Sequence, residues 1–122
     1  MIDLESLKNV RLLGGFRIVA IVATKEPLTD ALEREAIAQT RINASNFSIT
    51  MREGLSEREL SVTLYHEVLE AATVASPAPP LAVIEFNEGD FERAAQEAFT
   101  RFGEATLPNL NSMLQSFGFH GK

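Results

Sequence analysis

The sequence predicts a single α+β domain over residues 1–122, in which a small sheet packs on a buried helix and a C-terminal helical region. A chain of 122 residues lies near the most common domain size, and its 45% hydrophobic content is enough for a core. Strand-like apolar patterns occur before residue 53, and the strongest helix-like patterns follow it. Together these observations predict one compact domain that contains both kinds of element.

Two strands are predicted in the first half of the chain. Gly14-Gly15 marks a turn, and the β-branched run from Phe16 to Thr24 is dense enough to be a buried strand. From Thr40 to Arg52 apolar and polar residues alternate, which is typical of a half-buried strand. The phase of this alternation slips around Ser45-Asn46, where a bulge or a tight turn is expected. Between the strands, Thr29 to Ala38 is expected to form a short helix that begins at Thr29.

The clearest helix start in the chain is at Ser56. Ser56 and Glu59 form a capping box, in which each side chain binds the backbone amide of the other residue. The helix is expected to end near Ala75, because the prolines within residues 77–80 forbid its continuation. The apolar run 81–86 that follows predicts a strand or a buried connector.

A second helical region is expected to begin near Asn87. Its aromatic and small residues recur at helical spacing and should face the core: Phe91, Ala95, Phe99 and Phe102. Pro108 is expected to break this region. Leu110 to Phe117 then predicts a last short helix.

The composition excludes several classes of function. The net charge of −6 argues against a nucleic-acid partner, since a nucleic-acid backbone requires a cationic surface. The longest apolar run, Ile18 to Ala23, is far shorter than a membrane span, and the first residues lack the basic region of a signal peptide. The absence of cysteine excludes disulfides and thiolate metal sites. We therefore expect a cytoplasmic protein in which any metal is bound by imidazole and carboxylate groups.

One group of polar residues stands out on the helix that begins at Ser56. Its surface is mostly apolar, and a narrow polar stripe contains Glu59, Thr63, His66, Glu70 and Thr73, with Glu67 at the edge. His66 and Glu70 are four residues apart, so their side chains project from the same helix face. This is the spacing by which a helix presents two ligands to one metal ion. Glu67 would then be directed at a water on that ion, and would accept its proton.

The segment His66-Glu67-Val68-Leu69-Glu70 resembles the His-Glu-x-x-His helix of zincin metallopeptidases, with glutamate in place of the second histidine. The order of elements, an alternating strand, a capped helix and a second helix, is similar to compact zincin-like domains of phage proteins and of the ImmA/IrrE type of repressor-cleaving peptidase. The resemblance covers residues 40–100. It implies a metal-dependent, peptidase-like hydrolase in which His66 and Glu70 bind the metal and Glu67 is the general base.

A third ligand has to come from beyond Glu70. Glu88 is the best candidate, because it lies at the leading end of the buried stripe of the second helical region. Asp90 and Glu85 are the next candidates, and His120 lies in the tail. Zinc is the expected ion, although one imidazole and two carboxylates also suit manganese or iron(II).

Two other interpretations remain open from the sequence. The stripe could be a solvated face with an ordinary contact between His66 and Glu70, and acidic residues near Glu88 are common at the start of a helix. The absence of lysine and arginine between Glu59 and Thr73 argues against a solvated face. A metal-free, non-catalytic module with the same outline would instead bind a peptide or protein along the edge of the 47–51 strand. An exposed strand edge and the phenylalanine-rich C-terminal half would also permit a homodimer.

Overall fold

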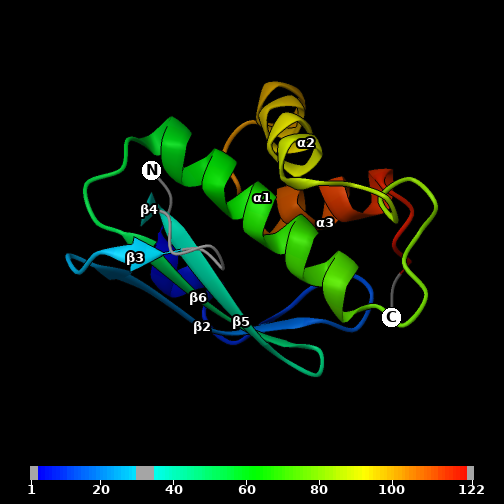
Figure 1. The fold of residues 1–122 in the computed structure, drawn as a ribbon, viewed down its shortest axis with the longest axis horizontal. Coiled ribbons are helices and arrows are strands. Elements are labelled where there is room, and N and C mark those ends of the chain that lie inside the picture. The colour runs from blue at the N-terminus through cyan, green and yellow to red at the C-terminus, as the bar shows by residue number, and fades with distance from the viewer. Residues whose placement is uncertain (1–2, 30–34, 121–122) are drawn as a thin grey trace.

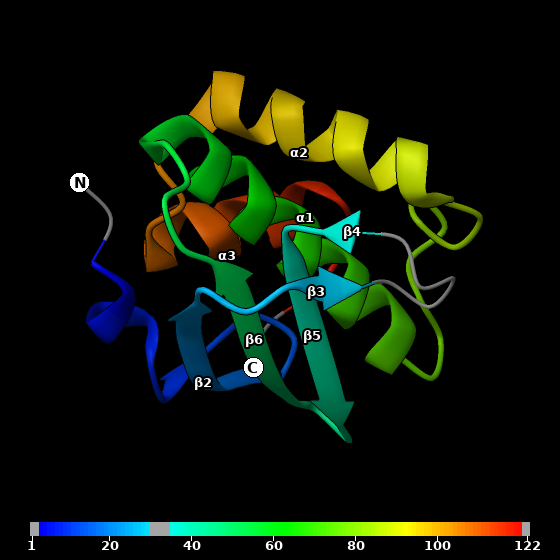
Figure 2. The ribbon, with the colours of Figure 1, turned by 60° about the vertical axis from the view of Figure 1, so that its left-hand side comes forward.

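The fold is α+β, as the sequence predicts, and consists of a four-stranded mixed sheet with three α-helices on one side of it (Figures 1 and 2). The computed structural model describes residues 3–29 and 35–120. Its elements in chain order are the 3-10 helix η1 (Leu4–Leu7), β1 (Val10–Arg11), β2 (Arg17–Thr24), β3 (Leu28–Thr29), β4 (Glu35–Ala36), β5 (Ala38–Asn43), β6 (Asn46–Arg52), α1 (Glu57–Ala75), α2 (Glu88–Phe102) and α3 (Leu107–Ser116). Within these two ranges no helix is long and apolar enough to cross a bilayer.

The strand order of the main sheet is β1-β2-β6-β5. β2 and β6 are parallel, whereas β1 pairs with β2 and β5 pairs with β6 in antiparallel fashion. β6 is therefore an interior strand, and the prediction that the 47–51 strand offers a free edge is wrong. The alternation of apolar and polar residues in this strand indicates that one of its faces is buried. It does not indicate whether the strand lies at the edge or in the interior of the sheet. The two edges of this sheet are β1 and β5.

The phase slip near Ser45-Asn46 is a tight turn between β5 and β6, one of the two alternatives that the sequence left open. Asn43 pairs with Asn46 across this turn, and Ala44 adopts a left-handed backbone with φ of 57°. The strand predicted after Gly14-Gly15 is confirmed by β2, but only one of its faces is buried: Ile18 and Ile21 are almost fully buried, whereas Val19 and Val22 are exposed.

The helix predicted from Thr29 to Ala38 is wrong in the residues of this range that the structure describes. The residues described there form β3 and β4, which pair antiparallel through Leu28 with Ala36, while residues 30–34 lie outside the described part of the chain. Gln39 at the start of β5 donates a hydrogen bond from Nε2 to the Thr29 carbonyl at 2.6 Å. Pairing with a neighbouring segment has thus overridden a weak helical pattern, as tertiary context often does.

α1 confirms the predicted helix and forms one wall of the hydrophobic core. Ser56 accepts a hydrogen bond from the Glu59 amide, and the Glu59 carboxylate accepts one from the Ser56 amide, so both halves of the capping box are present. The buried side chains of α1 pack against the apolar residues of β2 and β6, and the fully buried ones include Leu64, Tyr65, Val68, Leu69 and Ala72. The core therefore lies between the sheet and α1, and it holds α1 in a fixed orientation.

α2 begins where the sequence predicts but ends for a different reason. Asn87 caps it, and Gly103 at φ of 83° ends it, five residues before the proline that was expected to break it. Pro108 instead lies in the first turn of α3, where a missing amide costs nothing because that amide has no partner within the helix. Residues 81–85 form turns in which Val83 is fully buried, whereas Leu81 and Ile84 are exposed. The 81–86 segment is therefore neither a strand nor a buried connector, but a largely exposed connector with one residue in the core.

Candidate metal centre

The polar stripe of α1 opens onto a cleft between α1, α2 and the edge strand β5. The cleft has a volume of about 850 Å³. Its lining residues from the two helices are Thr63, His66, Glu67, Glu70, Glu88 and Glu92. The strand side is lined by Thr29, residues 36–38 and the Gln39–Arg41 segment. The candidate site therefore lies in an open cleft, with the helices α1 and α2 on one side and the strand β5 on the other.

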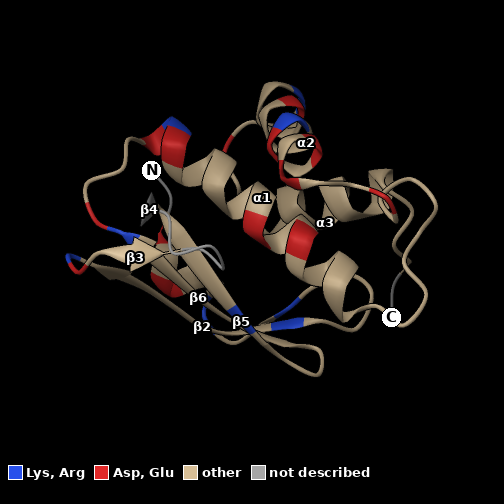
Figure 3. Ribbon diagram, viewed as in Figure 1, with Lys and Arg blue, Asp and Glu red and all other residues tan. Residues whose placement is uncertain are grey.

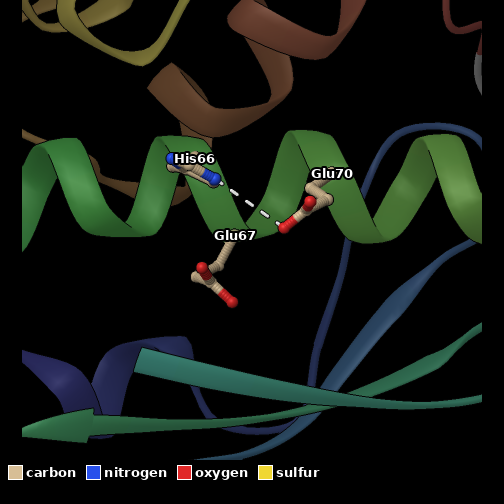
Figure 4. Close-up of side chains that lie close together, drawn as sticks. All are labelled: His66, Glu67 and Glu70. Atoms are coloured by element: carbon tan, nitrogen blue, oxygen red, sulfur yellow. Dashed lines mark ion pairs between the residues drawn. The ribbon is translucent and has the colours of Figure 1, made fainter. Parts of the chain in front are cut away.

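Three side chains of α1 come together on this cleft. Each of His66, Glu67 and Glu70 offers one ligand atom, and these atoms all lie within 4.8 Å of one another. Figure 4 shows His66 and Glu70 directed toward each other along one side of the helix, while Glu67 points toward the strands. His66 Nε2 lies 3.7 Å from Glu70 Oε1. This cluster can hold a metal ion.

α2 adds two carboxylates, one to each nitrogen of the His66 ring. Glu88 Oε2 lies 3.0 Å from Nε2, and Glu92 Oε1 lies 2.8 Å from Nδ1. The sequence predicted Glu88 but missed Glu92. The signal was available, because Glu92 follows Glu88 by four residues and so shares its helix face. Once Glu88 faces His66, Glu92 is the next acidic side chain along that face.

The other candidates for a third ligand lie elsewhere. Asp90 belongs to the N-cap of α2, where its carboxylate accepts hydrogen bonds from the Asn87 amide and from Arg93. Glu85 is exposed on the connector that precedes α2, and His120 is exposed after α3. The helix start therefore explains the acidic residue at position 90. Glu88 differs from Asp90, because its carboxylate contacts His66.

Burial and mutual repulsion raise the pKa values of Glu67 and Glu70, the two α1 carboxylates that line the cleft. Loss of water raises the pKa of Glu67 above its ordinary value, although a 2.6 Å hydrogen bond from Thr40 Oγ1 opposes the shift. For Glu70, burial and then the hydrogen bond and negative charge of Glu88 raise the pKa to about 8. The Glu70 side chain, which is 30% exposed, therefore holds a proton at neutral pH when no cation is bound.

His66 is shifted in the same direction. Its burial alone would lower the pKa of the imidazole, but the hydrogen bond to Glu92 and the charges of neighbouring carboxylates outweigh burial and raise it. The raised pKa values of both groups favour protons on His66 and Glu70 in the metal-free cluster. Protons in these positions occupy the places that a divalent cation would take.

The metal-free protein should become less stable as the pH rises. Between 4.5, the ordinary pKa of Glu70, and about 8, its value in the fold, the folded chain keeps a proton that the unfolded chain has lost, so the free energy of unfolding falls. The raised pKa of His66 acts in the same sense at higher pH. The full shift of Glu70 would correspond to about 4 kcal/mol between pH 5 and 8.5. Because solvent screens this partly exposed side chain, we expect a loss of about 1–2 kcal/mol, measured by urea unfolding in the presence of a chelator.

The variant Glu70→Gln should remove most of this slope, because its amide does not titrate. The exposed Glu97 on α2 provides a control, and Glu97→Gln should keep the wild-type slope. An unchanged slope in Glu70→Gln would contradict the raised pKa of Glu70.

Of the two distances from His66 Nε2 to a carboxylate oxygen, one matches the separation expected around one ion and the other is slightly longer. Two donors at about 2.1 Å from a common ion are separated by about 3.0 Å at a right angle and by about 3.4 Å at a tetrahedral angle. His66 Nε2 lies 3.0 Å from Glu88 Oε2 and 3.7 Å from Glu70 Oε1. One imidazole and two carboxylates in this arrangement fit a divalent ion with only small side-chain movements.

Comparisons with known proteins identify no relative: no family model, no curated protein and no solved structure matches the chain. A function for this chain must therefore be argued from its own residues and their geometry.

Proposed function

We propose that the chain is a metal-dependent, peptidase-like hydrolase of zincin type, in which His66, Glu70 and Glu88 bind the ion and Glu67 is the general base. The observation that carries the proposal is the orientation of His66. Its Nδ1 faces Glu92 at 2.8 Å, while its Nε2 faces Glu70 and Glu88. An imidazole held in this way presents the lone pair of Nε2 to the two carboxylates that would share the ion.

Glu92 would act through His66 and not as a ligand. A metal-binding histidine normally donates its other ring N–H to a carboxylate or a carbonyl, which fixes the tautomer and increases the basicity of the ligand. Glu92 Oε1 occupies that position at Nδ1. Because α1 and α2 both contribute to the arrangement, the packing of the two helices would position the centre before any ion binds.

Glu67 has the environment of a general base. Its burial raises its pKa toward neutrality, where a base is most effective. The hydrogen bond from Thr40 Oγ1 fixes one carboxylate oxygen, and the other remains available to accept a proton from water in the cleft. A divalent ion, when bound, would supply Lewis acidity toward a carbonyl oxygen and lower the pKa of that water.

Zinc is the first choice for this donor set, and manganese or iron(II) is the second. The absence of cysteine leaves nitrogen and oxygen donors alone, and a set with two carboxylates is harder than the usual zinc set of two histidines. Two carboxylates would also neutralise the charge of a divalent ion, so we expect weaker activation of water than in a two-histidine site.

Metal titration of the purified, chelator-treated protein tests the proposal. We expect one zinc ion per chain, an increase in melting temperature on binding, and tighter binding as the pH rises from 6 to 8, because the ion displaces protons from His66 and Glu70. Isothermal titration calorimetry in buffers of different ionisation enthalpy measures both the stoichiometry and the protons released. Binding without proton release would contradict the assigned ligands.

A second candidate is a metal-free module that binds a peptide or protein. The observation that favours it is that protons alone can neutralise the cluster, since the pKa values of His66 and Glu70 are both raised. The partner would then add to the edge strand β5, which lines the cleft. Absence of zinc, manganese and iron binding at pH 8 in the titration above would favour this candidate.

A further inference from the structure

Two arginines face each other on the β1–β2 hairpin. Arg11 and Arg17 are directly opposite in the antiparallel register, and Arg17 pairs on its other side with Asn46 at the start of β6. With Gly15 and Phe16 these residues line a pocket of about 360 Å³. The pocket could hold about twelve water molecules at about 30 Å³ each, so it is larger than a single small ion requires.

This pocket lies on the face of the sheet that the helices leave uncovered. Side chains alternate between faces along a strand, and the neighbours of the two arginines, Leu12, Phe16 and Ile18, are buried in the core. Arg11 and Arg17 therefore project to the opposite side. The three helices lie together on one side of the sheet (Figures 1 and 2), so this pocket and the candidate metal centre are separate sites.

Neither arginine has an acidic partner among the described residues. Within residues 3–29 and 35–120 no carboxylate forms an ion pair with Arg11 or Arg17, and the Arg17 guanidinium donates a hydrogen bond to the Asn9 carbonyl, at 3.3 Å. Like charges directly opposite each other on a sheet are destabilising. An arrangement of this kind is favourable when an anion lies between the two charges.

The surrounding charge is also unusual for this protein. The strands of the four-stranded sheet contain four arginines, Arg11, Arg17, Arg41 and Arg52, and no acidic residue, although the chain as a whole has a net charge of −6. Blue segments occur along the sheet and red segments mark the middle of α1 in Figure 3. The sheet would therefore attract an anion that the helices repel.

We propose that the pocket formed by Arg11, Arg17, Gly15 and Asn46 binds the phosphate group of a small phosphorylated molecule. Two guanidinium groups and an amide offer more donors than the two oxygens of a carboxylate can use, whereas a phosphate has three or more oxygens and a higher charge. Gly15 has φ of 85°, and a Cβ there would meet nothing within 4 Å, so the backbone of the turn is open to a close approach by the ligand. The volume beyond the phosphate would receive the rest of the molecule.

A backbone-amide NMR titration with inorganic phosphate, at constant ionic strength set by sodium chloride, tests this site. We expect saturable shifts confined to the neighbourhood of Gly15, Arg17 and Asn46. Arg11→Gln and Arg17→Gln should each weaken binding by about tenfold, the effect of losing one hydrogen bond to a charged group. Glycerol phosphate should bind at least as tightly as inorganic phosphate, since the pocket has room for its carbon chain.

Lys25→Gln is the matched control, because it also removes one positive charge. Lys25 follows the far end of β2, about 25 Å from Arg17 at about 3.3 Å per residue, and the variant should bind phosphate within about twofold of the wild type. An equal loss in Lys25→Gln, or shifts that never saturate, would show general charge attraction and overturn the proposal. Acetate that binds the pocket as tightly as inorganic phosphate would overturn the choice of phosphate. An oligonucleotide that binds where inorganic phosphate does not would overturn the small-molecule site. The amide spectra of the two arginine variants report whether they fold.

Discussion

Replacing Glu67 by glutamine should lower the rate of metal-dependent peptide hydrolysis by about 10²- to 10⁴-fold, the usual contribution of a general base. Glutamine keeps the size of the side chain and its hydrogen bond with Thr40 but has no basic oxygen. Zinc affinity should change much less, because the proposed ligands are His66, Glu70 and Glu88. Cleavage of fluorescently labelled casein by the zinc-loaded protein measures the rate, and calorimetric titration measures the zinc affinity.

Two controls make this result specific. Glu97→Gln removes an exposed carboxylate from α2 and should leave both the rate and the zinc affinity unchanged. Wild-type rates in Glu67→Gln would sink the assignment of the base. A zinc-loaded wild-type protein that cleaves neither casein nor a mixed peptide library would sink the hydrolase function while leaving the metal centre intact.

Replacing His66 by alanine should weaken zinc binding by more than about 100-fold, which is the upper end of the loss caused by changing an outer-shell partner alone. His66 is the only proposed nitrogen ligand, and its ring contacts the carboxylates of Glu70, Glu88 and Glu92. Without it, four carboxylates that include Glu67 would line the cleft, and a zinc ion would have only oxygen donors. Equilibrium dialysis with zinc at pH 8 measures the change.

The other histidine provides the matched control for this substitution. His120 is exposed beyond α3, so His120→Ala should bind zinc as the wild type does. Glu92→Gln should give an intermediate loss of about 10- to 100-fold, because it removes the charge that orients His66 without removing a ligand. Zinc binding that survives in His66→Ala would contradict the proposed centre, and circular dichroism of each variant reports whether its fold is retained.

Local patterns in the sequence determined most of the secondary structure. The capping box at Ser56 and Glu59, the prolines after α1 and the alternation in β6 each involve contacts between residues that are close in the chain, and each appears in the structure as predicted. The pattern between Thr29 and Ala38 misled because its spacing suits a helix weakly, whereas its pairing depends on segments that only the fold brings together.

Local patterns also determined half of the candidate site. His66, Glu67 and Glu70 share one helix face by their spacing alone, and the structure places their ligand atoms within 4.8 Å. Glu88 could be named because it begins the next helix, but its distance from His66 depends on how α2 crosses α1. The same crossing brings Glu92, which lies one turn after Glu88 on the same face of α2, to His66 Nδ1.

What the tertiary structure alone decided are the contacts between elements that are distant in the chain. The order β1-β2-β6-β5 makes β6 an interior strand and places Thr40 of β5 beside Glu67. The alternation of residues in β5 and β6 would be the same whether a strand lay at the edge or in the interior of the sheet. The register of β1 and β2 likewise sets Arg11 opposite Arg17. The physical reason is common to all of these contacts: helix and strand periods specify which face of an element is buried, whereas the packing of the whole core specifies which faces meet.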